Sequence, residues 1–204
     1  MEKEIENLIN QDYLKDTMTF ISFYTMTYES MVDYVVSQIH DFLCDISVEE
    51  GQLQYIETSK YKTQIKNRVV DKRGNKNVTK ASFLWLKDNN AISERDYEDF
   101  LMIKQQRNTF VHEMFQKVVQ GITEDEVDCL VKMILLYKKI SNWWFINIEC
   151  SIMGYELGED VDINGIQSDT TFILDIIRDV IFNGKSNEYQ EILKAYKDGA
   201  KNEV

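Results

Sequence analysis

The sequence contains no proline and only 8 glycines in 204 residues. Sheet-rich sandwiches and barrels use both residues freely, because proline and glycine supply the backbone conformations that tight turns need. A chain of this kind therefore favours long helices joined by short loops. Hydrophobic residues make up 44% of the chain, which is enough for a packed core and excludes wholesale disorder.

Apolar residues recur at intervals of three and four along several segments, the spacing of one face of an α-helix. This pattern predicts long helices over residues 16–43, 93–121 and 123–153, and shorter helices over residues 81–89 and 170–182. A last amphipathic helix is expected from Ser186 onward. The fold class predicted from the sequence is all-α, an antiparallel helical bundle with extra C-terminal helices.

Two of these helices begin with a capping signal. Ser93 precedes Asp96, and Thr123 precedes Glu126, at the spacing of a capping box. Gly121 is placed to end the helix between them. We expect residues 1–153 to form the main domain, and residues 154–204 to add a loop and two helices packed on the same domain.

The net charge of −12 argues against a general basic surface for nucleic acid. Residues 60–80 are different, because eight Lys or Arg residues stand against Asp71 alone. This segment carries +7, so the rest of the chain carries −19. Its centre, VVDKRGNKNV, contains a Gly-Asn turn signal and predicts a loop or a short hairpin.

The chain shows no pattern for a metal or a cofactor. Cys44, Cys129 and Cys150 are dispersed and fit buried hydrophobic positions in a reducing cytoplasm, and two histidines cannot complete a zinc site. Asp160–Gly165 opens like a calcium loop but lacks the carboxylate at its twelfth position. No signal peptide is evident, and the most apolar stretch, residues 131–153, is interrupted by charges, so we expect a cytoplasmic protein without a membrane span.

The segment QQRNTFVHEMF on the second long helix carries the strongest chemical signal. Taking Arg107 as the origin, Asn108 lies about 100° and His112 about 140° around the helix. The apolar residues of this helix centre on Arg107 itself, although a guanidinium cannot lose its charge and is costly to bury unpaired. Arg107 therefore needs a carboxylate, a second chain or an anionic ligand, unless it extends past the helix edge.

The pattern R-N-x-x-x-H, formed by Arg107, Asn108 and His112, resembles the signature of HEPN domains. These are small all-α bundles, many of which are RNA endonucleases of bacterial toxin–antitoxin and antiphage systems. The context agrees, because an early helix carries Tyr28 and Glu29 ahead of the motif helix. The resemblance covers about residues 12–153, and the residues after 154 match no family pattern.

The resemblance implies metal-independent cleavage of RNA, in which the ribose 2′-OH attacks its own phosphodiester. DNA lacks this hydroxyl and would not be a substrate. His112 would move protons near neutral pH, Arg107 would hold the phosphate oxygens, and Asn108 would orient either group. The resemblance also implies a homodimer, in which two facing motifs form one composite site with Arg107 at its seam.

Further partners follow from the same resemblance. RNA phosphates would contact the basic segment, and the candidate substrate-binding residues are Lys62, Lys66, Arg68, Lys72 and Arg73. A solvated loop, or an anchor for an acidic partner, is the alternative for this segment. An antitoxin or sensor protein is also implied. In one HEPN subgroup a nucleotidyltransferase antitoxin modifies a Tyr two residues after the His, and Met114 stands at that position here.

Two alternatives for the whole chain stay open at this point. A HEPN-like module without catalytic activity would bind a partner protein or a nucleotide, with Arg107 and His112 in structural roles. An unrelated helical bundle would pair Arg107 with a core carboxylate and leave His112 as an ordinary surface residue. In either case Trp143, Trp144 and Phe145 fit a core or interface position better than a ligand site.

Overall fold

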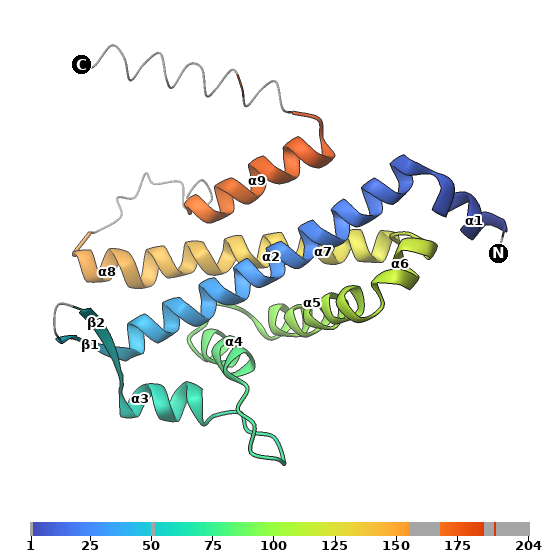
Figure 1. The fold of residues 1–204 in the computed structure, drawn as a ribbon. Helices are drawn as coiled ribbons and strands as arrows, with labels where there is room; N and C mark the ends of the chain where they lie inside the picture. Colours follow the sequence, from blue (N-terminus) through green and yellow to red (C-terminus); the bar gives the residue numbers. More distant parts are fainter. Residues whose placement is uncertain (1, 50–51, 156–167, 186–189, 191–204) are drawn as a thin grey trace, which may run out of the picture. The chain divides into compact units, whose positions relative to one another are not determined.

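The computed structural model describes residues 2–49, 52–155, 168–185 and 190. The chain divides into two compact units, Met1–Glu156 and Leu157–Val204, which we treat separately. Within the described residues the protein is mostly helical, and its strands form one two-stranded sheet (Figure 1). The all-α class expected from the sequence is confirmed at this level, with a β-hairpin added.

The first unit contains helices of very different lengths together with the two strands. In chain order they are α1 (Glu2–Ile9), α2 (Gln11–Leu43), β1 (Cys44–Glu49), β2 (Gln52–Glu57), α3 (Ser59–Tyr61), η1 (Lys62–Lys66), α4 (Val78–Asp88), α5 (Glu94–His112), α6 (Met114–Gln120), α7 (Glu124–Trp144), η2 (Phe145–Glu149) and α8 (Cys150–Met153). The two η segments are π-helical and continue α3 and α7 without a break.

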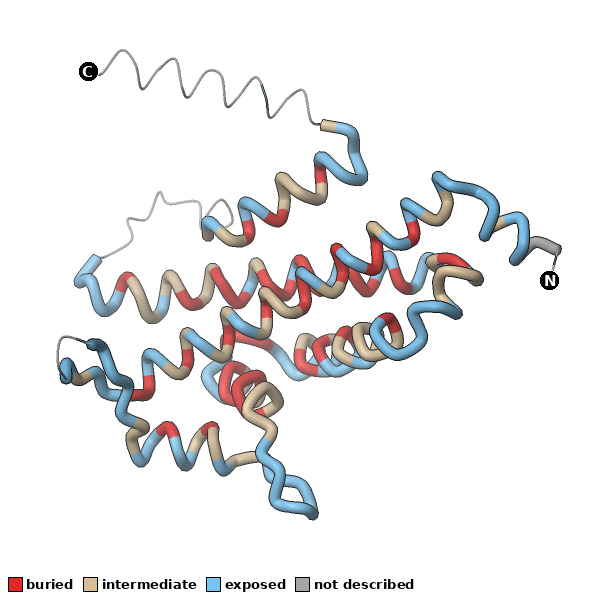
Figure 2. The backbone as a smooth tube through the Cα atoms, viewed as in Figure 1, coloured by how far each residue is buried: buried red, intermediate tan, exposed pale blue. Residues whose placement is uncertain are grey.

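The core of this unit lies between α2, α5 and α7, whose facing sides are buried (Figure 2). Tyr24 of α2 joins all three helices. Its hydroxyl donates to the Ile103 carbonyl on α5 at 3.1 Å and lies 3.0 Å from Cys129 Sγ on α7. The Phe110 ring packs edge-on against it at 4.9 Å. Burial raises the pKa of the Tyr24 hydroxyl above its ordinary value, so it stays a neutral hydrogen-bond donor.

Consecutive long helices alternate in direction. Tyr24 contacts Cys129 in the first half of α2, and Phe42 contacts Trp144 near the ends of α2 and α7, so these two helices run the same way. The intervening helix α5 runs in the opposite direction (Figure 1). The chain thus reverses direction twice across the core. As a result α5, which carries Arg107, Asn108 and His112, packs against both α2 and α7.

The helix-end signals in the sequence are confirmed. The Asp96 carboxylate accepts a hydrogen bond from the Ser93 backbone amide at 2.7 Å, and Ser93 Oγ accepts from Asp96 N, completing a capping box at the start of α5. Thr123 and Glu126 form the same box at the start of α7. Gly121 ends α6 with a φ of +90°, a conformation that favours glycine.

The single helix expected over residues 93–121 is wrong, because the backbone turns at Glu113 (φ −118°, ψ 23°). This turn separates α5 from α6 and allows α6 to pack against α1 and α2. As a result Val111, Met114 and Phe115 are exposed, although the helical pattern placed them on the core face. The Phe115 side chain is 77% exposed.

The sequence did not reveal the hairpin formed by β1 and β2. The strands are antiparallel, with Ile46 opposite Tyr55 and Val48 opposite Leu53. Residues directly opposite each other share a face of the sheet, so these four apolar side chains lie on one face, and all four are exposed (Figure 2). Apolar alternation is present in both strands and could have predicted them.

Residues 60–80 contain more helix than expected. Their first part forms α3 and η1, and their last part begins α4. Between them Val70 and Lys76 form an isolated antiparallel bridge, and Gly74 has a φ of +83°. The expected loop or hairpin is therefore confined to the exposed residues between Arg68 and Asn77.

The described part of the second unit contains α9 (Asp169–Phe182). Ser168 Oγ caps its start by accepting a hydrogen bond from Thr171 N, and the helix ends at Asn183–Gly184 as the sequence predicts. The calcium-like loop Asp160–Gly165 and the helix expected from Ser186 lie outside the described residues. The packing of residues 154–204 on the main domain stays a prediction. No described helix combines the length and low charge needed to cross a bilayer.

Candidate functional site

Arg107 lies on the side of α5 that faces α2. Its Nη2 atom forms an ion pair with Glu29 Oε1, and its guanidinium lies 5.6 Å from the centre of the Tyr28 ring. The side chains of Arg107 and Glu29 are 28% and 44% exposed, so the pair lies at the edge of the core. Arg107 was expected to need a carboxylate, a second chain or an anionic ligand. In the structure its partner is a carboxylate of its own chain, Glu29.

This environment leaves hydrogen-bonding capacity on the guanidinium. Arg107 Nη1 donates to Asn108 Oδ1 at 3.3 Å, and Arg107 Nε is buried with no hydrogen-bond partner among the described residues. An arginine carries five N–H donors, and the described contacts of Arg107 use two of them. The partly exposed head group can therefore still bind an anion.

Asn108 and Glu29 hold Arg107 from two directions. Asn108 comes from the same helix and Glu29 from α2, so the orientation of Arg107 depends on the packing of α5 against α2. Tyr28, next to Glu29, is buried, and burial raises the pKa of its hydroxyl to about 12. Tyr28 thus stays neutral and presents its ring to the guanidinium.

His112 is the last residue of α5, directly before the turn at Glu113. Its side chain is exposed and has no hydrogen bond to any described residue. His112 is thus free to reach a ligand outside the chain.

Within one chain the motif residues do not converge on a single point. His112 lies about 7.5 Å further along the helix than Arg107 and about 140° around it. Arg107 and Asn108 touch each other, whereas no described contact joins either of them to His112. One copy of the chain therefore offers a paired Arg–Asn group and a separate exposed imidazole.

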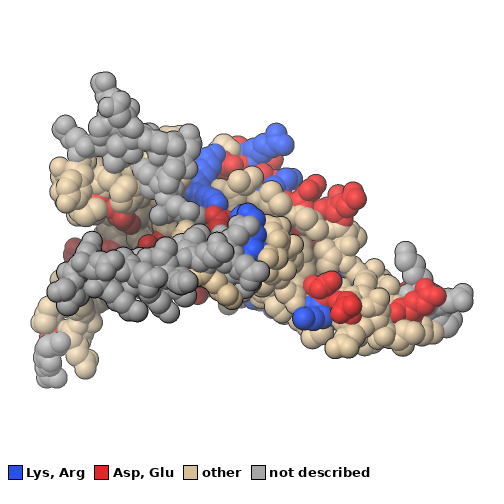
Figure 3. Space-filling model, turned by 90° about the horizontal axis from the view of Figure 1, so that it is seen from above, with Lys and Arg blue, Asp and Glu red and all other residues tan. Residues whose placement is uncertain are grey.

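The expected substrate-binding residues lie on other elements. Lys66 pairs with Glu57 at 2.5 Å, and Arg68 pairs with Asp88 at 2.6 Å. The remaining three, Lys62, Lys72 and Arg73, have exposed side chains. No hydrogen bond or ion pair among the described residues connects this group to the motif on α5. On the face seen in Figure 3, basic and acidic side chains are interspersed.

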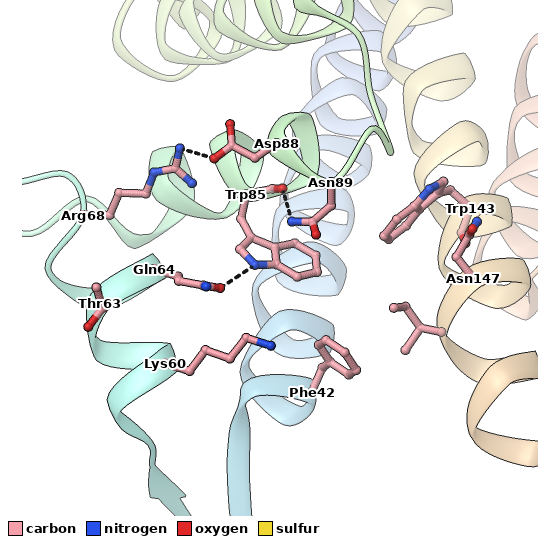
Figure 4. Close-up of a pocket in the computed structure, with 11 residues that line it drawn as sticks. Phe42, Lys60, Thr63, Gln64, Arg68, Trp85, Asp88, Asn89, Trp143 and Asn147 are labelled. Carbon is pink, nitrogen blue, oxygen red and sulfur yellow. Dashed lines mark hydrogen bonds and ion pairs between the residues drawn. The ribbon is translucent and has the colours of Figure 1, made fainter.

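A second feature was not predicted from the sequence. Trp143 and Trp85 line a cavity of about 660 Å³ in the first unit, together with Arg68 of the basic segment (Figure 4). Trp144 is buried, as expected for a core residue, but Trp143 beside it is partly exposed. Four separate stretches of sequence supply the lining of this cavity, so no local motif could have indicated it.

The remaining histidine and the three cysteines lie in surroundings typical of residues that stabilise the fold. His40 lies in the last turn of α2, where its ring contacts those of Tyr55 and Tyr61, both at 5.1 Å. The three cysteines are buried and unpaired. Over the residues that the structure describes, no three His, Cys, Asp or Glu side chains gather in a way that could hold a metal ion.

Comparisons with known proteins add no family to this description. No protein-family model, curated protein or solved structure matches the chain.

Proposed function

We propose that this protein is a HEPN-like, metal-independent RNA endonuclease that acts as a homodimer in a toxin or phage-defence role. The observation that carries the proposal is the R-N-x-x-x-H motif on α5, with a partly exposed Arg107 and an exposed His112. These are the residues that the resemblance to HEPN domains assigns to catalysis. The fold under this proposal is a HEPN-like helical bundle.

The chemistry fits the groups available. Attack by the ribose 2′-OH forms a bond from O2′ to phosphorus and breaks the bond to O5′, so one proton leaves O2′ and another reaches O5′. His112 exchanges these protons, because imidazole has a pKa near neutrality. Arg107 stabilises the extra negative charge on the phosphate oxygens with the Nη–H donors of its partly exposed head group that no described contact uses.

A second copy of the chain would complete the site. Val111, Met114 and Phe115 are exposed immediately around His112, which is an unusual place for three large apolar side chains. A twofold contact through these residues would bring the two copies of His112 toward each other and exclude water from the cleft. Such a dimer contact also accounts for the exposed apolar side chains of Val111, Met114 and Phe115 on a highly charged chain.

The basic segment would hold the RNA strand. Lys62, Lys72 and Arg73 are exposed cations on a chain whose other segments repel polyanions. Lys66 and Arg68 belong to the same segment but already have carboxylate partners, so they contribute less attraction. Affinity confined to one segment suits an enzyme that must not bind RNA indiscriminately.

The test is RNA cleavage in the presence of EDTA, on single-stranded and structured substrates. Wild type should cleave, whereas Arg107→Ala and His112→Ala should reduce the rate by at least about 100-fold, the usual contribution of a general acid–base group. Phe115→Asp should give monomers by light scattering and lose activity. Activity that is unchanged in Arg107→Ala and His112→Ala would disprove the site.

A second candidate function is favoured by the pairing of Arg107 with Glu29. An arginine that is paired with a carboxylate of its own chain can have a purely structural role. The chain would then be a HEPN-like module without catalytic activity that binds a partner protein or a nucleotide. A folded dimer that cleaves no RNA would support this function over the first.

A further inference from the structure

The cavity of about 660 Å³ lies at the end of the first unit where α2 finishes. Its walls come from the last turn of α2, from α3 and η1, from the C-terminal end of α4, and from the junction of α7 with η2 (Figure 4). Small-molecule sites in proteins typically occupy about 300–1,000 Å³. Phe42, which lines it, follows Glu29 by thirteen residues on α2, so the cavity lies about 20 Å along that helix from Arg107.

The apolar walls of the cavity are aromatic. Trp85 and Phe42 lie on one side and Trp143 on the other (Figure 4). The rings of Trp85 and Trp143 are 6.4 Å apart and almost perpendicular, at 81°. Trp85 is fixed, because its Nε1 atom donates to Gln64 Oε1 at 3.0 Å. Rigid aromatic faces of this kind suit a flat ring that stacks against them.

The charged groups of the cavity favour an anion. Among the described residues that line it, Lys60 and Arg68 are the cations and Asp88 is the one carboxylate. Asp88 is already paired with Arg68, whereas the contact described for Lys60 is with the Phe42 ring, 5.8 Å from its Nζ atom. Lys60 is therefore an uncompensated positive charge beside the aromatic wall, on a chain with a net charge of −12.

Polar groups at the rim can distinguish one ring from another. Asn89 Nδ2 donates to the Trp85 carbonyl at 2.8 Å, and Asn147 Nδ2 donates to the Trp143 carbonyl at 2.9 Å. The oxygen atoms of both amides, and the Nε2 atom of Gln64, have no hydrogen bond to any described residue. They offer donors and acceptors to the edge of a heterocycle, which a purely hydrocarbon ligand could not use.

Both π-helical segments of the described chain face this cavity. Thr63 and Gln64 belong to η1, and Asn147 and Ile148 belong to η2. A π-helix is rarer than an α-helix and occurs frequently at functional sites, where it shifts side chains out of regular register. Two such segments on opposite walls of one cavity are a second observation, independent of the lining chemistry.

From these features we infer that the cavity binds a nucleoside phosphate, with its base stacked on the partly exposed Trp143 ring, beside the buried Trp85 ring, and its phosphate on Lys60. The base would use the free amide groups of Gln64 and Asn147. The same chemistry is present in a free nucleotide and in one residue of an RNA strand. The site is separate from the motif on α5, so this inference does not depend on the proposed cleavage.

Binding can be measured directly on the full chain. The three tryptophans of the chain, Trp85, Trp143 and Trp144, lie in or next to the cavity, so tryptophan fluorescence, excited selectively over the 11 tyrosines, reports on this region alone. The probes are the four ribonucleoside monophosphates, the matching nucleosides, inorganic phosphate, and an oligonucleotide of fully 2′-O-methylated RNA. The methylated strand lacks the 2′-OH, so it stays intact even if the protein is a ribonuclease.

Two outcomes support the inference and identify the source. Saturable quenching by a monophosphate, tighter than by its nucleoside or by inorganic phosphate, indicates a site for a free nucleotide. Binding of the oligonucleotide without binding of the monophosphates indicates a subsite for an RNA strand. Absence of binding by every probe, or equal affinity for nucleoside and monophosphate, would overturn the inference.

Variants locate the bound ligand, with calorimetry as the readout. Trp143→Leu should weaken binding at least about fivefold, because base–aromatic stacking is lost while the site stays apolar. Lys60→Ala should remove the preference for the phosphate form and its dependence on salt. Lys15→Ala removes the same charge from an exposed position far along α2 and should change nothing. Binding that is equally strong in Trp143→Leu and Lys60→Ala would place the ligand elsewhere and refute the inference.

Discussion

Arg107 of α5 is held by Glu29 of α2, and this ion pair connects the candidate catalytic motif to the core of the protein. The pair is partly exposed, so its contribution to stability is reduced by solvent screening. Its larger effect is on orientation, since Glu29 and Asn108 together fix which N–H donors of Arg107 remain available. Glu29 is thus a positioning residue for the proposed site.

The substitution Glu29→Gln tests this role. It should lower the free energy of unfolding by no more than about 1 kcal/mol, because both partners are partly exposed. The rate of RNA cleavage should nevertheless fall, because kcat is lower while KM is unchanged. Glu94→Gln breaks the exposed pair with Lys87 at 2.9 Å and serves as the control with normal cleavage. Equal cleavage by the two variants would contradict the positioning role.

Glu126 is the most connected buried carboxylate of the first unit. It is paired with Lys117 of α6 at 2.5 Å, and it accepts from Gln106 Nε2 on α5 at 2.8 Å and from Thr123 N at 2.9 Å. Its side chain is only 5% exposed. This one carboxylate therefore ties together the ends of three helices.

Removal of the Glu126 carboxylate should be costly. Glu126→Ala leaves the partly buried Lys117 ammonium unpaired and removes the hydrogen bonds of a buried carboxylate, so it is expected to destabilise the protein by about 3 kcal/mol. The neighbouring Asp125→Ala, at an exposed position, should cost about 0.5 kcal/mol or less. Urea denaturation of both variants measures the difference. Similar midpoints for the two would show that the Glu126 contacts contribute little.

Gly121 permits a close approach between the end of α6 and α2. A Cβ atom at this position would lie 2.5 Å from the Tyr13 hydroxyl oxygen, in a backbone conformation with a φ of +90°. Gly121→Ala should therefore destabilise the protein by more than the roughly 1–3 kcal/mol that this backbone conformation (φ +90°, ψ 178°) costs a residue other than glycine. Thermal denaturation, evaluated as a free-energy difference, measures this effect.

Two comparisons separate the causes at Gly121. Gly154 has the milder left-handed conformation (φ +69°, ψ 23°) and open space around its Cα, so Gly154→Ala should show only the roughly 1–2 kcal/mol cost of that conformation. Tyr13→Phe removes the crowding hydroxyl, so it should recover part of the loss when combined with Gly121→Ala. If Gly121→Ala and Gly154→Ala were equally destabilising, the contact with Tyr13 would be unimportant.

Asp179 on α9 gives a pH-dependent prediction for the second unit. Hydrogen bonds from the Arg178 guanidinium lower the pKa of its carboxyl group to about 2. Because this lies below the ordinary value of about 3.9, ionised Asp179 favours the folded state above pH 4. That contribution is lost as the pH falls toward about 2.

The pKa of Asp179 can be followed by NMR of its carboxyl carbon. Wild type should titrate near 2, and Arg178→Ala should move the pKa upward toward the ordinary value. The loss of stability between pH 4 and pH 2 should be smaller in Arg178→Ala than in wild type. A wild-type carboxyl that titrates near 3.9 would show that the hydrogen bonds from Arg178 do not form in solution.

Local chemistry explains which parts of the fold could be predicted. The capping boxes at Ser93 and Thr123 and the glycine at 121 act within one turn of helix, so their sequence spacing was sufficient. The break at Glu113 has no such signal, because glutamate favours helices and the turn serves the packing of α6. The hairpin over residues 44–57 was missed because its apolar alternation is short and interspersed with acidic residues, which makes the strand pattern weak.

The candidate site shows the same division. The spacing of Arg107, Asn108 and His112 was visible in the sequence, and so was the need of Arg107 for a partner. The identity of that partner, Glu29, depends on how α2 and α5 pack and could not be read locally. The cavity at Trp143 depends on four separate segments, so it could be found only in three dimensions.

The most direct test of the proposed function is the chemical identity of the RNA ends produced in EDTA. Attack by the 2′-OH predicts a 2′,3′-cyclic phosphate on one product and a 5′-hydroxyl on the other. An RNA with a single 2′-deoxy nucleotide at the cleavage position should be resistant there, and His112→Ala should produce neither end. Cleavage of the deoxy position, or identical products from His112→Ala, would contradict the account.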